Sequence, residues 1–240
     1  MKKWSTAVLA GIISFMAFAW IAHRSPAKTD DEQFDAIVST MPTYQVLKEQ
    51  EPQLWDSIRT RALTMQKEGK TEQQIVDAIQ PQVLNLQMQR LQTAPDENVV
   101  AYMKINMEQT AAVQKVSDDD CYRFLFPDVK GGINPIRILS QDLFHRRMEI
   151  DAAMMRAAMG PNKHTVTPQE REHAQQDIKP VAQKLSEKYG QDLAIMSNPA
   201  SGVGKEKITC NIVQDLWNGV LTLPQDKAAG VIRFAIDSSN

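Results

Sequence analysis

The sequence contains little cysteine, glycine or aromatic side chain, and each shortage excludes a class of protein. Its two cysteines, among 240 residues, lie far apart, which excludes Cys-x-x-Cys redox and zinc motifs. With 10 glycines and 12 prolines, the chain is neither collagen-like nor of low complexity. Aromatic residues make up 6%, whereas there are 12 methionines, a mixture more typical of helices than of sheets. The hydrophobic fraction of 42% and the charged fraction of 23% are those of a folded protein.

Several familiar site motifs are also missing. No Gly-x-Ser-x-Gly segment occurs, so the commonest serine-hydrolase signature is absent. The glycine-rich residues 202–205 lack both the earlier glycine and the following Ser or Thr of a phosphate-binding loop. The three aspartates at 118–120 lack the alternating ligands, central glycine and terminal glutamate of an EF-hand, so we interpret them as a helix start. The sequence therefore predicts no cofactor.

Positive charge is not in excess either. The chain carries 27 Lys and Arg against 29 Asp and Glu, and three of the basic residues lie in the acid-free residues 1–27. The remainder holds 24 basic and 29 acidic residues, a net charge of −5. This balance argues against a nucleic-acid partner, which requires a basic surface. We interpret the short cluster His145-Arg146-Arg147 as a solvent-exposed helix face.

The N-terminal segment is the one long apolar run. After Lys2 and Lys3, an uncharged stretch of about 28 Å in helical form extends from Trp4 to Ala22, enough to cross a bilayer core. We expect residues 1–27 to be an uncleaved membrane anchor or, alternatively, a signal segment cut after a small-x-small site at 17–19 or 25–27. A buried helix of a soluble protein is a third interpretation. The basic start places the N-terminus in the cytoplasm.

This orientation predicts a location. We expect a bacterial-type inner-membrane protein with a single span, whose residues 28–240 form one all-helical domain in the periplasm. The alternative is a secreted or periplasmic protein released by cleavage. In an exported domain, Cys121 and Cys210 would form a disulfide, although two buried free thiols are the alternative.

Residues 28–240 carry helical patterns almost throughout, and we predict an all-α fold, an irregular bundle of about seven to nine helices. Capping patterns mark helix starts at Thr71, Ser117 and Thr167. Pro81 should break or kink a helix. A long helix is expected over 136–159 and a loop over 198–205, while 207–213 has a strand as its alternative.

Two pairs of residues suggest a metal site. His145 and Glu149 are four apart on one predicted helix, and Glu170 and His173 are three apart on another, as in the Glu-x-x-His unit of di-iron bundles. Only one such unit is present, so a mononuclear site from these four residues is the most that the spacing allows. The simpler interpretation is that Glu170 caps its helix and the other three are exposed polar residues.

The sequence favours an interaction protein over an enzyme. We expect a tethered scaffold, assembly factor or chaperone-like module that binds a protein partner and has no catalytic activity. One alternative is an envelope hydrolase or metal-assisted enzyme that uses the helix-borne His and Glu side chains. Another is a secreted helical factor. The methionines fall mostly at helical spacing and fill the core or, alternatively, line an adaptable groove for a partner helix.

Overall fold

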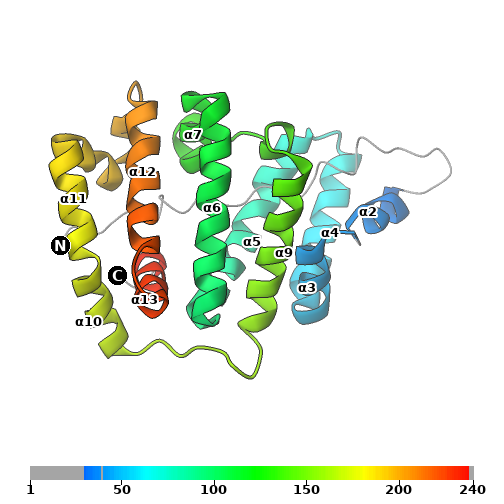
Figure 1. Cartoon of the computed structure of the whole chain (residues 1–240). Helices are drawn as coiled ribbons and strands as arrows, with labels where there is room; N and C mark the ends of the chain where they lie inside the picture. The colour runs from blue at the N-terminus through cyan, green and yellow to red at the C-terminus, as the bar shows by residue number, and fades with distance from the viewer. Residues whose placement is uncertain (1–29, 39, 238–240) are drawn as a thin grey trace.

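A computed structural model describes residues 30–38 and 40–237, and this part of the chain is helical and contains no strand. Figure 1 shows the helices standing side by side in a row, with α10 and α11 at one edge and α2 to α4 at the other. The α-helices are α2 (Asp30–Val38), α3 (Pro42–Gln50), α4 (Pro52–Lys67), α5 (Glu72–Thr93), α6 (Asp96–Val116), α7 (Asp118–Leu125), α8 (Pro127–Lys130), α9 (Gln141–Ala157), α10 (Pro168–Asp177), α11 (Lys179–Tyr189), α12 (Glu206–Leu221) and α13 (Gln225–Ile236). The 3-10 helices are η2 (Pro135–Arg137), η3 (Gly190–Ser197) and η4 (Pro199–Gly202).

The helix starts follow from local chemistry, as predicted. Thr71 and Gln74 form a reciprocal capping box at the start of α5. The hydroxyl groups of Ser117 and Thr167 accept hydrogen bonds from backbone N–H groups in the first turns of α7 and α10. Proline occupies the first turn of α3, α4, α8, α10 and α11, where its missing N–H costs nothing. These prolines divide the chain into more helices than the seven to nine expected.

Helix α5 runs through Pro81 to Thr93 without a break, because the buried Ile79 and Val83 on either side hold both halves against the core. One predicted boundary was wrong. The helix expected over 136–159 begins only at Gln141, after the 3-10 turn η2, because the Ser140 side chain accepts a hydrogen bond from the N–H of Leu143 and caps α9 there.

The C-terminal segments also differ in detail. The loop expected over 198–205 contains the 3-10 helix η4, and the alternative strand over 207–213 lies within α12. Helix α6 is the centre of the bundle, in contact with α7, α9, α12 and α13. The buried apolar residues form one cluster that takes in side chains from α2 to α13. Seven methionines are buried in this cluster, and Met159 is exposed.

The predicted disulfide is present. Cys121 in α7 and Cys210 in α12 are bonded, both without exposed surface, and their Cα atoms are 6.3 Å apart. No helix of the described residues is both long enough and apolar enough to cross a bilayer. The predicted anchor or signal segment, residues 1–27, lies outside the described part of the chain.

Candidate functional site

A polar cavity of about 530 Å³ lies where α10 packs beside α13, next to the N-terminal end of α6. Figure 1 shows the connection between α9 and α10 crossing this end of the bundle, opposite to α7. Twelve residues line the cavity, and all but Ala174 and Gly230 are polar or charged. Its volume is in the range of sites that take small ligands or a few side chains. We refer to it below as the polar cavity.

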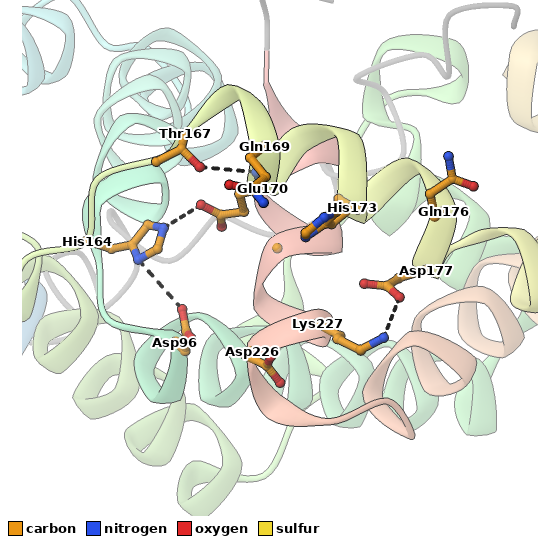
Figure 2. Close-up of a pocket in the computed structure, with 12 residues that line it drawn as sticks. Asp96, His164, Thr167, Gln169, Glu170, His173, Gln176, Asp177, Asp226 and Lys227 are labelled. Atoms are coloured by element: carbon orange, nitrogen blue, oxygen red, sulfur yellow. Dashed lines mark hydrogen bonds and ion pairs between the residues drawn. The ribbon is translucent and has the colours of Figure 1, made fainter.

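The N-terminal cap of α10 positions the central carboxylate of the cavity. The Thr167 hydroxyl accepts a hydrogen bond of 3.1 Å from the N–H of Glu170, and Pro168 fixes the first helical residue. The glutamate side chain then points toward His164, as Figure 2 shows. The position of Glu170 follows directly from the capping pattern that the sequence predicts.

Four side chains form a ring at the wall of the cavity, and three of them line it. Glu170 contacts His164 Nε2 at 2.7 Å through one oxygen and accepts a hydrogen bond of 3.0 Å from Arg233 through the other. Arg233 also donates to Asp96 at 2.7 Å, and the Asp96 carboxylate lies 4.0 Å from His164 Nδ1. The Arg233 side chain is 1% exposed, so its charge is neutralised inside the fold by two carboxylates at the cavity wall.

The same ring fastens the connection between α9 and α10 to the bundle. The backbone N–H of His164 donates to the carbonyl of Thr93 at 2.8 Å, and Arg233 donates to the carbonyl of Ala94 at 2.7 Å. In return, Gln92 donates to the carbonyl of Arg233 at 2.9 Å. Hydrogen bonds to residues 92–94 therefore hold both His164 and α13 in the wall of the polar cavity.

The four residues suggested for a metal site are divided between two helices. His145 and Glu149 lie exposed on α9, whereas Glu170 and His173 lie on α10 and line the polar cavity. Glu170 is already bonded to His164 and Arg233. Among the described residues, no three His, Cys, Asp or Glu side chains are grouped as metal ligands would be.

Sequence reasoning missed three members of the ring, Asp96, His164 and Arg233. None of the three was singled out from the sequence as a site residue. They come from α6, the α9–α10 connection and α13, so no short spacing pattern links them. The one usable signal was Glu170, whose capping position indicated where a carboxylate would be held.

We expect Arg233→Met to lower the free energy of unfolding by about 2 kcal/mol, because it leaves Asp96 and Glu170 facing each other without a cation. The cost is smaller than for a fully buried pair, since both carboxylates keep some contact with water. Urea unfolding followed by circular dichroism measures the loss. The control is Arg156→Met, which removes an exposed arginine 3.6 Å from Glu49 and should cost under about 0.5 kcal/mol. Equal losses in the two variants would contradict this account of the ring.

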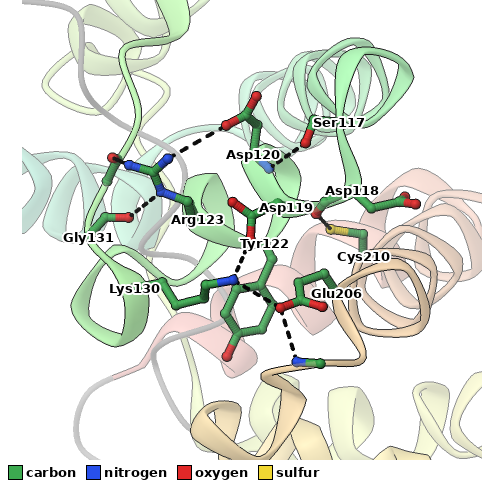
Figure 3. A network of polar contacts seen from close by, with 12 residues as sticks. Ser117, Asp118, Asp119, Asp120, Tyr122, Arg123, Lys130, Gly131, Glu206 and Cys210 are labelled. Carbon is green, nitrogen blue, oxygen red and sulfur yellow. Dashed lines mark hydrogen bonds and ion pairs between the residues drawn. The ribbon is translucent and has the colours of Figure 1, made fainter.

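A second polar network lies around the disulfide, at the start of α12 (Figure 3). Glu206 accepts hydrogen bonds of 3.0 Å from the N–H of Gly204 and from Lys130, and Lys130 also contacts Asp119 of α7. These contacts join α7, α8 and α12 on the side of the bundle where Cys121 and Cys210 are bonded. Donation from the Gly204 and Glu206 backbone N–H groups, with Lys130, lowers the pKa of Glu206 to about 2.

This lowered pKa predicts a pH-dependent contribution to stability. Because the folded state holds Glu206 ionised to about pH 2, the stabilisation is complete above the ordinary pKa of 4.5 and is lost as the pH falls toward 2. We therefore expect Glu206→Gln to be less stable than the native chain at pH 6 and equally stable near pH 2. Urea unfolding at pH 6, 4 and 2.5 tests this, with Glu172→Gln, at an exposed glutamate, as the control. A difference that does not change with pH would contradict it.

Comparisons with known proteins gave no match. No protein-family model matches the chain, and neither the curated proteins nor the solved structures include a significant match.

Proposed function

We propose that this protein is a membrane-tethered, extracytoplasmic helical module that binds a protein partner, as a scaffold, assembly factor or chaperone-like protein, without catalysing a reaction. The observation that carries the proposal is the bonded pair Cys121–Cys210, buried between α7 and α12. Disulfides that serve structure persist in oxidising compartments such as the periplasm. The apolar residues 4–22 supply a segment long enough for the tether.

The polar cavity supports binding as the activity. Its lining offers carboxylates, amides and a hydroxyl to a ligand, and most of its ion pairs hold neighbouring helices together. A cavity of this kind, built on helices and fixed by contacts to several segments, is suited to recognition, because its shape is set before the partner arrives.

The compartment is tested by thiol labelling of whole cells that express the full chain. We expect Cys121 and Cys210 to resist alkylation after denaturation and to react once a reductant is added. If both cysteines react without a reductant, the domain faces a reducing compartment and the proposal fails. N-terminal sequencing of the same material separates the two forms of export: retention of Met1 identifies an anchor, and its loss identifies a secreted factor.

Partner binding is tested by site-specific photo-cross-linking in intact membranes. A cross-linking amino acid at Gln169, exposed at the edge of the polar cavity, should give a reproducible cross-linked protein. The control places the same group at Gln53, exposed on α4, which lies across the row of helices from α10 in Figure 1. Absence of any reproducible product from Gln169 would argue against a protein partner at this cavity.

A further inference from the structure

Two glycines lie inside α-helices of the described chain, and only one of them is required by packing. At Gly219 in α12, an added Cβ atom would lie 2.8 Å from Val181 Cγ1, so close packing against α11 excludes a side chain. At Gly230 in α13, an added Cβ would meet only the Glu170 side chain, at 3.6 and 3.7 Å, which is ordinary van der Waals contact. The fold itself would therefore accept alanine at position 230.

The glycine at position 230 carries an energetic cost. In a helix interior, glycine is about 1 kcal/mol less favourable than alanine. Gly230 is buried and lines the polar cavity beside Glu170, so a methyl group there would occupy space in the cavity. The glycine keeps this part of the cavity free of a side chain, which is an advantage only if a ligand occupies that space.

The charges of the lining residues indicate which class of ligand the cavity would bind. Four carboxylates line the polar cavity, belonging to Asp96, Glu170, Asp177 and Asp226. Arg233 neutralises part of this charge from beneath, and Lys227 is bonded to Asp177 at 2.7 Å. These four carboxylates face one arginine and one lysine, Arg233 and Lys227. Asp226, exposed in the first turn of α13, accepts no hydrogen bond from a described residue.

We propose that the polar cavity binds a primary ammonium group, presented by a lysine side chain of the protein partner or by a free alkyl amine, with Asp226 as its carboxylate acceptor and Gly230 leaving room for the alkyl chain. An ammonium group has three donors, which suits a lining rich in carboxylate and amide oxygens. The cavity wall already holds one ammonium, that of Lys227 on Asp177 (Figure 2). If the ammonium group belongs to a lysine of the protein partner, this proposal rests on the function proposed above. If it belongs to a free alkyl amine, it does not.

The test measures binding to the purified full chain by isothermal titration calorimetry at low salt. The probes are 1,5-diaminopentane and two short peptides of equal sequence, one with a free lysine and one with that lysine acetylated. We expect the native chain to bind at least one of the two ammonium probes, to reject the acetylated peptide and to lose affinity with added salt. Binding of the diamine alone identifies a free amine as the ligand, and binding of the lysine peptide identifies a partner side chain.

Two variants locate the site. Asp226→Asn should weaken binding about tenfold, and its control, Asp128→Asn in the first turn of α8, should leave affinity unchanged. Gly230→Ala should weaken binding at least about fivefold while it raises the melting temperature, which shows that the glycine serves the cavity and not the fold. Failure of both ammonium probes to bind, or equal affinity in all variants, overturns the inference. If the cysteines are nevertheless oxidised in cells, the function proposed above still stands.

Discussion

Removal of the Cys121–Cys210 disulfide should lower the free energy of unfolding by about 4–5 kcal/mol. The bond closes a loop with a sequence separation of 89, and in the chain-entropy model a loop of this size restricts the unfolded chain by that amount. For a domain of this size, the melting temperature of the Cys121→Ala/Cys210→Ala variant should fall by roughly 10–20 °C. Thermal and urea unfolding of the full chain measure both quantities.

Reduction supplies the matched control for this variant. Addition of a reductant should destabilise the native chain by nearly the same amount and leave the alanine variant unchanged, because the variant has no disulfide to lose. A loss below about 1 kcal/mol in the double variant would show that the packing of α7 against α12 already supplies the stability assigned to the bond.

Replacement of Arg147 by methionine should cost about 3–5 kcal/mol. The guanidinium is completely buried, donates to Asp151 at 2.8 Å, and lies 4.5 Å from the ring centre of Tyr102. Burial by itself would lower the pKa of Arg147, but the neighbouring Asp151 raises it, so the side chain stays charged. Without the arginine, Asp151 becomes a buried charge with no cation to balance it, which is among the costliest changes in a protein interior.

The adjacent residue is the control for Arg147. Arg146 lies on the same helix, is partly exposed, and pairs with Glu108 and Asp142 at the surface, so Arg146→Met should cost under about 1 kcal/mol. Arg147→Met/Asp151→Leu should recover much of the lost stability, because it removes both charges together. Urea unfolding of the native chain, of Arg147→Met, of Asp151→Leu and of the double variant gives the coupling energy. Additive effects of the two substitutions would show that the pair does not act as a unit.

The contrast between Arg146 and Arg147 also shows where sequence reasoning failed. The cluster at 145–147 was interpreted as a solvent-exposed face, yet Arg147 has no exposed surface and contacts Asn106 and Gln109 of α6. Whether an arginine on a helix is buried depends on the partners that α6 and α9 bring together. These partners lie about 40 residues away in the sequence, beyond any local pattern.

Helix starts were predictable because their causes are local. The caps at Thr71, Ser117 and Thr167 involve residues three positions apart, and the structure confirms all three. Pro81 does not end α5, because the packing of its neighbours outweighs its local preference. The polar cavity was only partly visible for the same reason: Glu170 follows from a cap, whereas Arg233 reaches it from 63 residues further along the chain.

The positions of the two cysteines determine when the disulfide can form relative to synthesis of the chain. At a synthesis rate of about 5–20 residues per second, Cys210, which lies 89 positions after Cys121, appears roughly 5–20 s later. During this interval α7 has no partner cysteine, and the carboxylates of Asp96 and Glu170 lack the guanidinium of Arg233, which arrives later still with α13. The covalent link and the polar cavity are thus completed last, so a partially made chain presents neither to its surroundings.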